Sequence, residues 1–172
     1  MAVSHYPSVY LDTNILSYLH YSGHDILTIS RHIMTRDWWE NERQNFRLYS
    51  SRITMRELET GKYEAQTAAV AQVRRIVFLS VTDKVSAMAT IYLNKRLVPE
   101  SKRADGLQLA LATVYGVDYL LSWNHAHLIK WETQKMLLEI NSHFGYGSPL
   151  LVTPENIPQV RMGQRIKRKK GY

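Results

Sequence analysis

Three acidic residues and one amide residue, far apart in the chain, could together bind a metal ion: Asp12, Glu57, Asp105 and Asn124. Carboxylates gathered at one place repel one another and raise one another's pKa unless a cation neutralises them. Hard divalent cations prefer carboxylate, amide and water oxygens, so Mg²⁺ or Mn²⁺ is the expected cofactor. The chain has no cysteine and no dense histidine cluster, so neither zinc nor copper is expected.

The elements that must position these residues alternate between strands and helices. Short runs rich in Val, Leu, Phe and Tyr predict strands at residues 8–13, 46–51, 77–81, 118–123 and 149–154. Apolar residues at helical spacing predict helices at about residues 25–44, 64–76, 83–97, 102–116 and 131–145. This alternation predicts an α/β fold in which helices cover both faces of a mainly parallel sheet.

The order of the elements places all four residues at the carboxyl edge of that sheet, where ligands collect in open parallel sheets. Asp12 ends the first strand, and Asn124 follows the fourth. Glu57 is expected in the first turn of the helix that follows the second strand. Asp105 opens the helix that descends before the fourth strand, so it starts at the same edge. We therefore predict a catalytic site of these four residues, with the three acids as metal ligands.

Each acid also has a purely structural interpretation. Asp12 could cap the following turn together with Thr13 and Asn14. Residues 54–57 match the capping box T-x-x-E, in which the glutamate bonds back to the backbone at the start of a helix. Asp105 could stabilise the positive end of its helix. Their common edge favours a shared function over three separate caps.

The positive charge of the chain is concentrated at its C-terminus. The formal net charge is +7, and six positive side chains lie in residues 161–172, which contain no acid. We expect a single domain over residues 1–160 and a basic, flexible tail over residues 161–172. The N-terminus lacks a signal-peptide pattern, and no segment approaches the roughly 18 apolar residues of a membrane span. Together with the absence of cysteine, this predicts a soluble cytoplasmic protein without membrane contact.

Motifs of several other enzyme classes are absent from the sequence. It contains no Walker loop, no G-x-G-x-x-G and no G-x-S-x-G, so nucleotide hydrolases, dinucleotide-dependent enzymes and serine hydrolases are disfavoured. Asn14 stands where the second Asp of the D-x-D start of haloacid-dehalogenase-like enzymes belongs, which disfavours that class of phosphotransferase.

Four segments, in order, resemble the PIN domain, the nuclease fold of VapC-type toxins. They span about residues 8–157 and read YLDTNIL, SRITMRELETG, KRADGLQLALATVYGVDYLLSWNHAHL and LLVTPENI. The resemblance implies a three-layer α/β/α sandwich with strand order 3-2-1-4-5. It also implies a ribonuclease that uses Mg²⁺ or Mn²⁺ to hydrolyse RNA phosphodiester bonds, with metal-site acids at Asp12, Glu57 and Asp105.

The sequence departs from the family pattern at Asn124, where many PIN domains carry a fourth acid. A neutral amide lowers the negative charge of the site, which argues against a second metal ion. Basic residues near the predicted edge could position the phosphate backbone of RNA or simply be solvated. The supporting positions of the family match Thr13, Asn14 and Ser122, and the basic residues are Arg56, Lys102 and Arg103.

The resemblance further implies partners besides an RNA substrate. The chain would be the toxin of a toxin–antitoxin pair, and a small antitoxin would insert a basic side chain among the acids. PIN domains of this type often form homodimers, for which residues 18–49 offer apolar area. The alternative is a catalytically weak PIN-like module that binds RNA or protein, because its site is short of one acid.

Overall fold

The chain folds around one parallel sheet of five strands in the order β3-β2-β1-β4-β5, as the resemblance implied. This computed structural model describes residues 6–21 and 23–157, so the predicted basic tail at 161–172 lies outside the described residues. The strands are β1 (Ser8–Leu11), β2 (Arg47–Ser51), β3 (Val77–Leu79), β4 (Tyr119–Leu121) and β5 (Leu150–Val152). All four strand pairings are parallel. The predicted α/β class and strand order are therefore confirmed.

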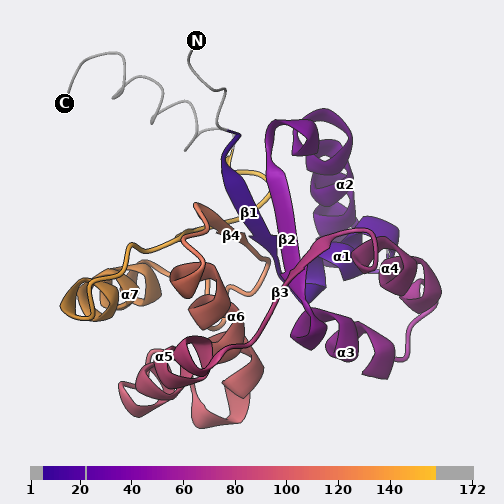
Figure 1. Ribbon diagram of the computed structural model, residues 1–172. Coiled ribbons are helices and arrows are strands. Elements are labelled where there is room, and N and C mark those ends of the chain that lie inside the picture. The colour runs from indigo at the N-terminus through magenta and orange to yellow at the C-terminus, as the bar shows by residue number, and fades with distance from the viewer. Residues whose placement is uncertain (1–5, 22, 158–172) are drawn as a thin grey trace, which may run out of the picture.

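Helices cover both faces of this sheet (Figure 1). On one face lie α1 (Thr13–His20), α2 (Ile26–Asn41), α3 (Arg52–Thr60) and α4 (Gln66–Val73). The other face carries α5 (Asp83–Asn94), α6 (Arg103–Val114) and α7 (Trp131–His143). The chain also contains two short 3-10 helices: η1 (Arg43–Asn45) precedes β2, and η2 (Glu100–Lys102) precedes α6. Among these described elements, no helix is long and apolar enough to cross a membrane.

The central strand β1 is buried on both faces because each face has its own core. Val9 and Leu11 pack with the core under α1–α4, whereas Tyr10 packs with the core under α5–α7. This alternation follows from the two-residue period of a strand, and a run that is apolar throughout is typical of a strand covered on both sides. The sheet is therefore a rigid support for side chains at its carboxyl edge.

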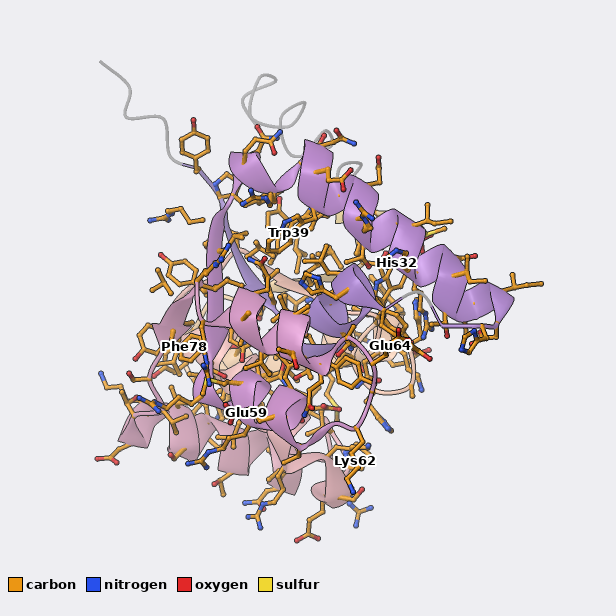
Figure 2. All side chains as sticks on the ribbon, turned by 90° about the vertical axis from the view of Figure 1, so that its right-hand side faces the viewer. His32, Trp39, Glu59, Lys62, Glu64 and Phe78 are labelled. Atoms are coloured by element: carbon orange, nitrogen blue, oxygen red, sulfur yellow. The ribbon has the colours of Figure 1, made fainter. Side chains whose placement is uncertain are left out.

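Figure 2 shows the side of the molecule that α1–α4 cover, where the N-terminal half of α2 extends beyond the neighbouring helices. Three large apolar side chains in this half are mostly exposed: Ile26, Leu27 and Ile33 are 84%, 57% and 60% exposed. The apolar area predicted within residues 18–49 thus includes an exposed surface on α2.

The structure corrects the predicted position of Glu57. The helix α3 begins at Arg52, directly after β2, with Ser51 as its N-cap. The Ser51 hydroxyl accepts hydrogen bonds from the backbone N–H groups of the next turn, at 3.2 and 3.5 Å. Glu57 therefore lies in the second turn rather than the first, and Thr54 is a buried interior residue rather than the start of a capping box. The prediction was wrong because Ser51, an equally good cap, stands three residues earlier.

A second difference concerns the residues after Asp12. The sequence indicated only a turn there, but the structure forms the helix α1 directly from Thr13. Ile15, Leu16 and Leu19 bury one side of this helix against the sheet. Ser17 and Tyr18, on the other side of α1, are partly exposed and line a pocket.

Candidate active site

Asp12 is both the N-cap of α1 and a buried carboxylate at the end of β1. Its Oδ1 accepts a hydrogen bond from the backbone N–H of Thr13 at 2.6 Å, so the capping interpretation is correct as far as it goes. Its Oδ2 accepts from Asn14 Nδ2 at 2.6 Å and from the Ser122 hydroxyl at 2.5 Å. The pKa of Asp12 is raised to about 7, mainly by burial and also by the nearby charges of Asp105 and Glu57, although the Ser122 hydrogen bond acts to lower it.

Glu57 extends from α3 toward α1 and α6. The Thr13 hydroxyl donates a hydrogen bond to Glu57 Oε2, and Gln108 Nε2 donates to the same oxygen at 3.1 Å. Burial raises the pKa of Glu57, and the charge of Asp105 adds to this, whereas the Thr13 hydrogen bond and Lys102 lower it. The Glu57 carboxylate thus accepts hydrogen bonds from α1 and α6 and does not cap the start of its own helix.

Asp105 lies in the first turn of α6, as predicted, and is held by Asn124. Asn124 Nδ2 donates a hydrogen bond to Asp105 Oδ2 at 3.0 Å, while Asn124 Oδ1 accepts from the backbone N–H of His127 at 3.0 Å. Burial raises the pKa of Asp105, whereas His127 and Lys102 lower it. An ionised acid in place of Asn124 could not make this donation. The amide therefore positions Asp105.

Ser122 and Asn14 join the start of α1 to the end of β4. The Ser122 hydroxyl accepts from Asn14 Nδ2 at 3.1 Å and from the backbone N–H of Asn124 at 2.9 Å. Asn14 Oδ1 in turn accepts from the backbone N–H of Trp123 at 2.8 Å. The predicted supporting residues thus lie in contact with the acids or with the loops that carry them.

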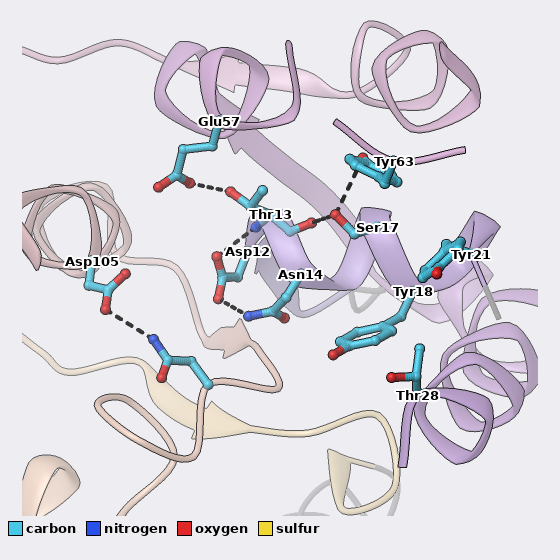
Figure 3. Close-up of a pocket in the computed structure, with 11 residues that line it drawn as sticks. Asp12, Thr13, Asn14, Ser17, Tyr18, Tyr21, Thr28, Glu57, Tyr63 and Asp105 are labelled. Carbon is cyan, nitrogen blue, oxygen red and sulfur yellow. Dashed lines mark hydrogen bonds between the residues drawn. The ribbon is translucent and has the colours of Figure 1, made fainter. Parts of the chain in front are cut away.

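All four predicted catalytic residues line one pocket of about 440 Å³ at the carboxyl edge of the sheet (Figure 3). Of the predicted phosphate contacts, Lys102 lies close enough to Glu57 and Asp105 to affect the pKa of both. Arg56 and Arg103 are exposed on α3 and α6. The complete lining consists of Asp12, Thr13, Asn14, Ser17, Tyr18, Tyr21, Thr28, Glu57, Tyr63, Asp105 and Asn124.

The donor atoms of this pocket suit a hard cation, although the acids do not form a closed ligand cage. Carboxylates that raise one another's pKa gain from a nearby cation, and their oxygens are the atoms that Mg²⁺ and Mn²⁺ prefer. Within residues 6–21 and 23–157, however, no group of three or more His, Cys, Asp or Glu side chains is arranged so that it could hold a metal ion. The predicted cluster is thus a shared pocket, in which water would have to complete the coordination of a metal ion.

Several residues in the pocket lining, and Gln108 beside it, were not predicted. Gln108 lies one turn after Asp105 on α6, and its Oε1 is buried without a hydrogen-bond partner in the described structure. Ser17 lies four residues after Thr13, and Tyr18 lies four residues after Asn14, with Tyr21 at the C-cap, a signal that requires knowing that α1 starts at Thr13. Thr28 and Tyr63 come from other elements, and no local pattern marks them.

Comparison with known proteins identifies the fold of the chain through solved structures. No family model matches the sequence, and no curated protein sequence matches it either. Several solved structures resemble it, and two of them serve as examples. VapC20 of Mycobacterium tuberculosis, a sarcin-ricin loop cleaving toxin, has a TM-score of 0.52 and 19% identity over 66% of this chain and 87% of its own. VapBC2 of Rickettsia felis, bound to a DNA fragment from its promoter, has a TM-score of 0.51 and 17% identity over 84% of this chain and 97% of its own. The chain therefore has the PIN-domain fold of VapC-type proteins.

Proposed function

We propose that the protein is an endoribonuclease that uses Mg²⁺ or Mn²⁺ to hydrolyse RNA phosphodiester bonds. The observation that carries this proposal is the pocket shared by Asp12, Glu57 and Asp105, which come from three separate elements. The fold adds support, because VapC20, which shares it, is a toxin that cleaves the sarcin-ricin loop.

Asp12 and Asp105 would hold the metal ion, with Glu57 binding it directly or through water. Once bound, the ion would supply positive charge for the phosphate and lower the pKa of a water molecule in the pocket. Such a site needs its carboxylates ionised, although burial holds the pKa of each above its ordinary value, and repulsion from neighbouring acids adds to this for Asp12 and Glu57. Metal binding should therefore release protons at neutral pH.

The remaining side chains of the site position the acids and the substrate. Thr13 and Gln108 hold Glu57 in position by hydrogen bonds to its Oε2. In this position the carboxylate can orient an attacking water molecule or accept its proton. Asn124 fixes Asp105 in the same way. Lys102, exposed beside the pocket, can attract the RNA phosphate without reading its sequence.

We extend the proposal to a toxin that pairs with a small antitoxin and forms a homodimer. VapBC2 of the same fold was solved bound to promoter DNA, which supports a regulatory partner for this chain. Three acids in one pocket would bind a basic side chain from such a partner. The exposed apolar side chains Ile26, Leu27 and Ile33 on α2 offer a surface for a second copy.

A second candidate function is a catalytically weak RNA-binding or protein-binding module. Two observations favour it: Asn124 stands where many PIN domains have an acid, and the acids of the described residues form no ready metal-binding group. In this case the fold would retain the pocket without hydrolysis.

Cleavage of a labelled RNA in the presence of Mn²⁺ distinguishes the two functions. We expect the wild type to cleave, EDTA to stop cleavage, and Asp12→Asn or Asp105→Asn to reduce the rate by about 100-fold or more, as for loss of a group that acts in the transition state. Asp37→Asn, which removes an exposed acid on α2, is the matched control and should cleave normally. Cleavage by both pocket variants at the wild-type rate would refute the nuclease proposal. RNA binding without cleavage by the wild type would favour the second candidate.

A further inference from the structure

The pocket has a second half, beyond the acids, that the proposed nuclease chemistry does not use. It is lined by Ser17, Tyr18, Tyr21, Thr28 and Tyr63, and Figure 3 shows these side chains on the α1–α2 side of Asp12. We name this half the tyrosine subsite. We propose that it holds one unpaired nucleobase of the RNA, beside the phosphodiester bond that the acids cleave. This inference rests on the proposed function.

The three tyrosines come from two segments and stay partly exposed toward the pocket. Tyr18 and Tyr21 lie at the end of α1, and Tyr63 lies between α3 and α4. The rings of Tyr21 and Tyr63 meet edge to face, with centroids 6.2 Å apart and an interplanar angle of 64°. A planar base can stack on such half-buried rings because every base has a π face. A subsite of this kind therefore accepts any base.

Hydroxyl groups complete the subsite and link it to the acids. The Ser17 hydroxyl donates to the Thr13 carbonyl at 3.1 Å and lies 3.4 Å from the Tyr63 hydroxyl. Thr13 is also the residue that donates to Glu57. One turn of α1 thus joins the aromatic and the acidic halves, so a base held in the subsite would fix the position of its neighbouring phosphate at the acids.

A positively charged side chain, Arg31, lies beside the tyrosine subsite, whereas the other half of the pocket is lined by acids. Arg31 of α2 donates to the Tyr18 hydroxyl at 3.2 Å, and its guanidinium lies 5.6 Å from the centroid of the Tyr18 ring and 5.7 Å from that of Trp123. A cation behind the aromatic half would attract the phosphate that flanks a stacked base. It would repel a basic peptide segment. The observations therefore favour a nucleotide over a basic protein partner in this half.

The inference predicts that RNA binds through one base at this place and that the base must be unpaired. Loss of one stacked base should weaken binding about 5- to 150-fold. The test measures binding of a short fluorescent single-stranded RNA by anisotropy in EDTA, which stops metal-dependent cleavage. A series of the same RNA, each with one abasic position, locates the base that the protein holds.

Tyr18→Leu and Tyr63→Leu should each weaken binding, and the sensitive abasic position should lose its effect in these variants. Tyr18→Phe and Tyr63→Phe keep the rings and should bind nearly as the wild type does. Tyr115→Leu is the matched control, because Tyr115 is 43% exposed at the opposite end of α6 from Asp105. Circular dichroism of each variant confirms its fold, and the abasic series with the wild-type protein still tests the subsite if a Leu variant unfolds.

The outcomes separate this inference from the proposed function. An abasic effect that depends on Tyr18 and Tyr63 supports the tyrosine subsite even if the protein never cleaves RNA. Equal binding by the wild type and the folded Leu variants, or equal binding of every abasic RNA, overturns the subsite even if the protein cleaves. Equal affinity for the single-stranded RNA and for its fully paired duplex also overturns the inference. That result would indicate that this half of the pocket binds a protein partner.

Discussion

Asp12→Asn should make the metal-free protein more stable at alkaline pH, although it removes a residue from the proposed active site. The folded protein holds the pKa of Asp12 at about 7, compared with 3.8 for an ordinary exposed Asp. The cost of ionising this side chain in the folded state is therefore about 4 kcal/mol, since one pKa unit is worth about 1.4 kcal/mol. The Asn variant never carries this charge.

The sign of the pH dependence follows from proton binding. Below about pH 4, Asp12 is protonated in both the folded and the unfolded state, so it contributes no pH dependence. Between about pH 4 and pH 7, the unfolded state loses this proton while the folded state keeps it, so the free energy of unfolding falls as pH rises. Above about pH 7 the penalty is constant. The advantage of Asp12→Asn should grow over this interval and then level off.

The variant also loses part of the hydrogen bonding of Asp12. Its amide NH₂ cannot accept from Asn14 Nδ2 as Asp12 Oδ2 does, which costs about 1 kcal/mol. The expected net gain at about pH 8 in EDTA is thus about 3 kcal/mol. For a chain of this size that is a rise in Tm of roughly 6–12 °C.

Chemical denaturation and differential scanning calorimetry at about pH 8 and about pH 4, both in EDTA, measure this difference. At the acidic value the gain should disappear or change sign. Asp37→Asn, which changes an exposed acid, should be neutral at both values. A folded Asp12→Asn protein that is less stable than the wild type at the alkaline value in EDTA would refute the reasoning that the Asp12 charge is buried without compensation.

Three further predictions test the contacts around the pocket. Gln108→Leu frees Glu57 Oε2 from one donor, so we expect a fall in the rate of RNA cleavage by about 10-fold with folding retained; unchanged single-turnover rates would count against a positioning role. Asn124→Asp replaces a donor to Asp105 with a charge, so the metal-free protein should lose about 1–3 kcal/mol of stability while binding Mn²⁺ more tightly, as calorimetry can measure. Asp118→Ala removes the acceptor for Ser8 at the far edge of the sheet, so it should lower stability by about 1–3 kcal/mol yet leave Mn²⁺ affinity unchanged.

Much of the fold could be predicted because strands and helices alternate with clear periodicity. Each of the five predicted strand runs contains an observed strand, and topology alone places Asp12 and Asp105 at one edge. Helix boundaries were harder to predict, because Ser51 and Thr54 are both good caps and only packing decides between them. Contacts between elements, such as Gln108 with Glu57 or Tyr63 with Ser17, depend on tertiary packing, so no local pattern reveals them.

The most direct test of the account is a crystal soaked in Mn²⁺, with anomalous density examined in the pocket between Asp12 and Asp105. The account predicts one Mn²⁺ peak with Asp12 and Asp105 oxygens among its ligands, and no such peak in crystals of Asp12→Asn. A pocket without Mn²⁺ at concentrations that occupy other surface sites, or a peak that contacts none of the three acids, would contradict it.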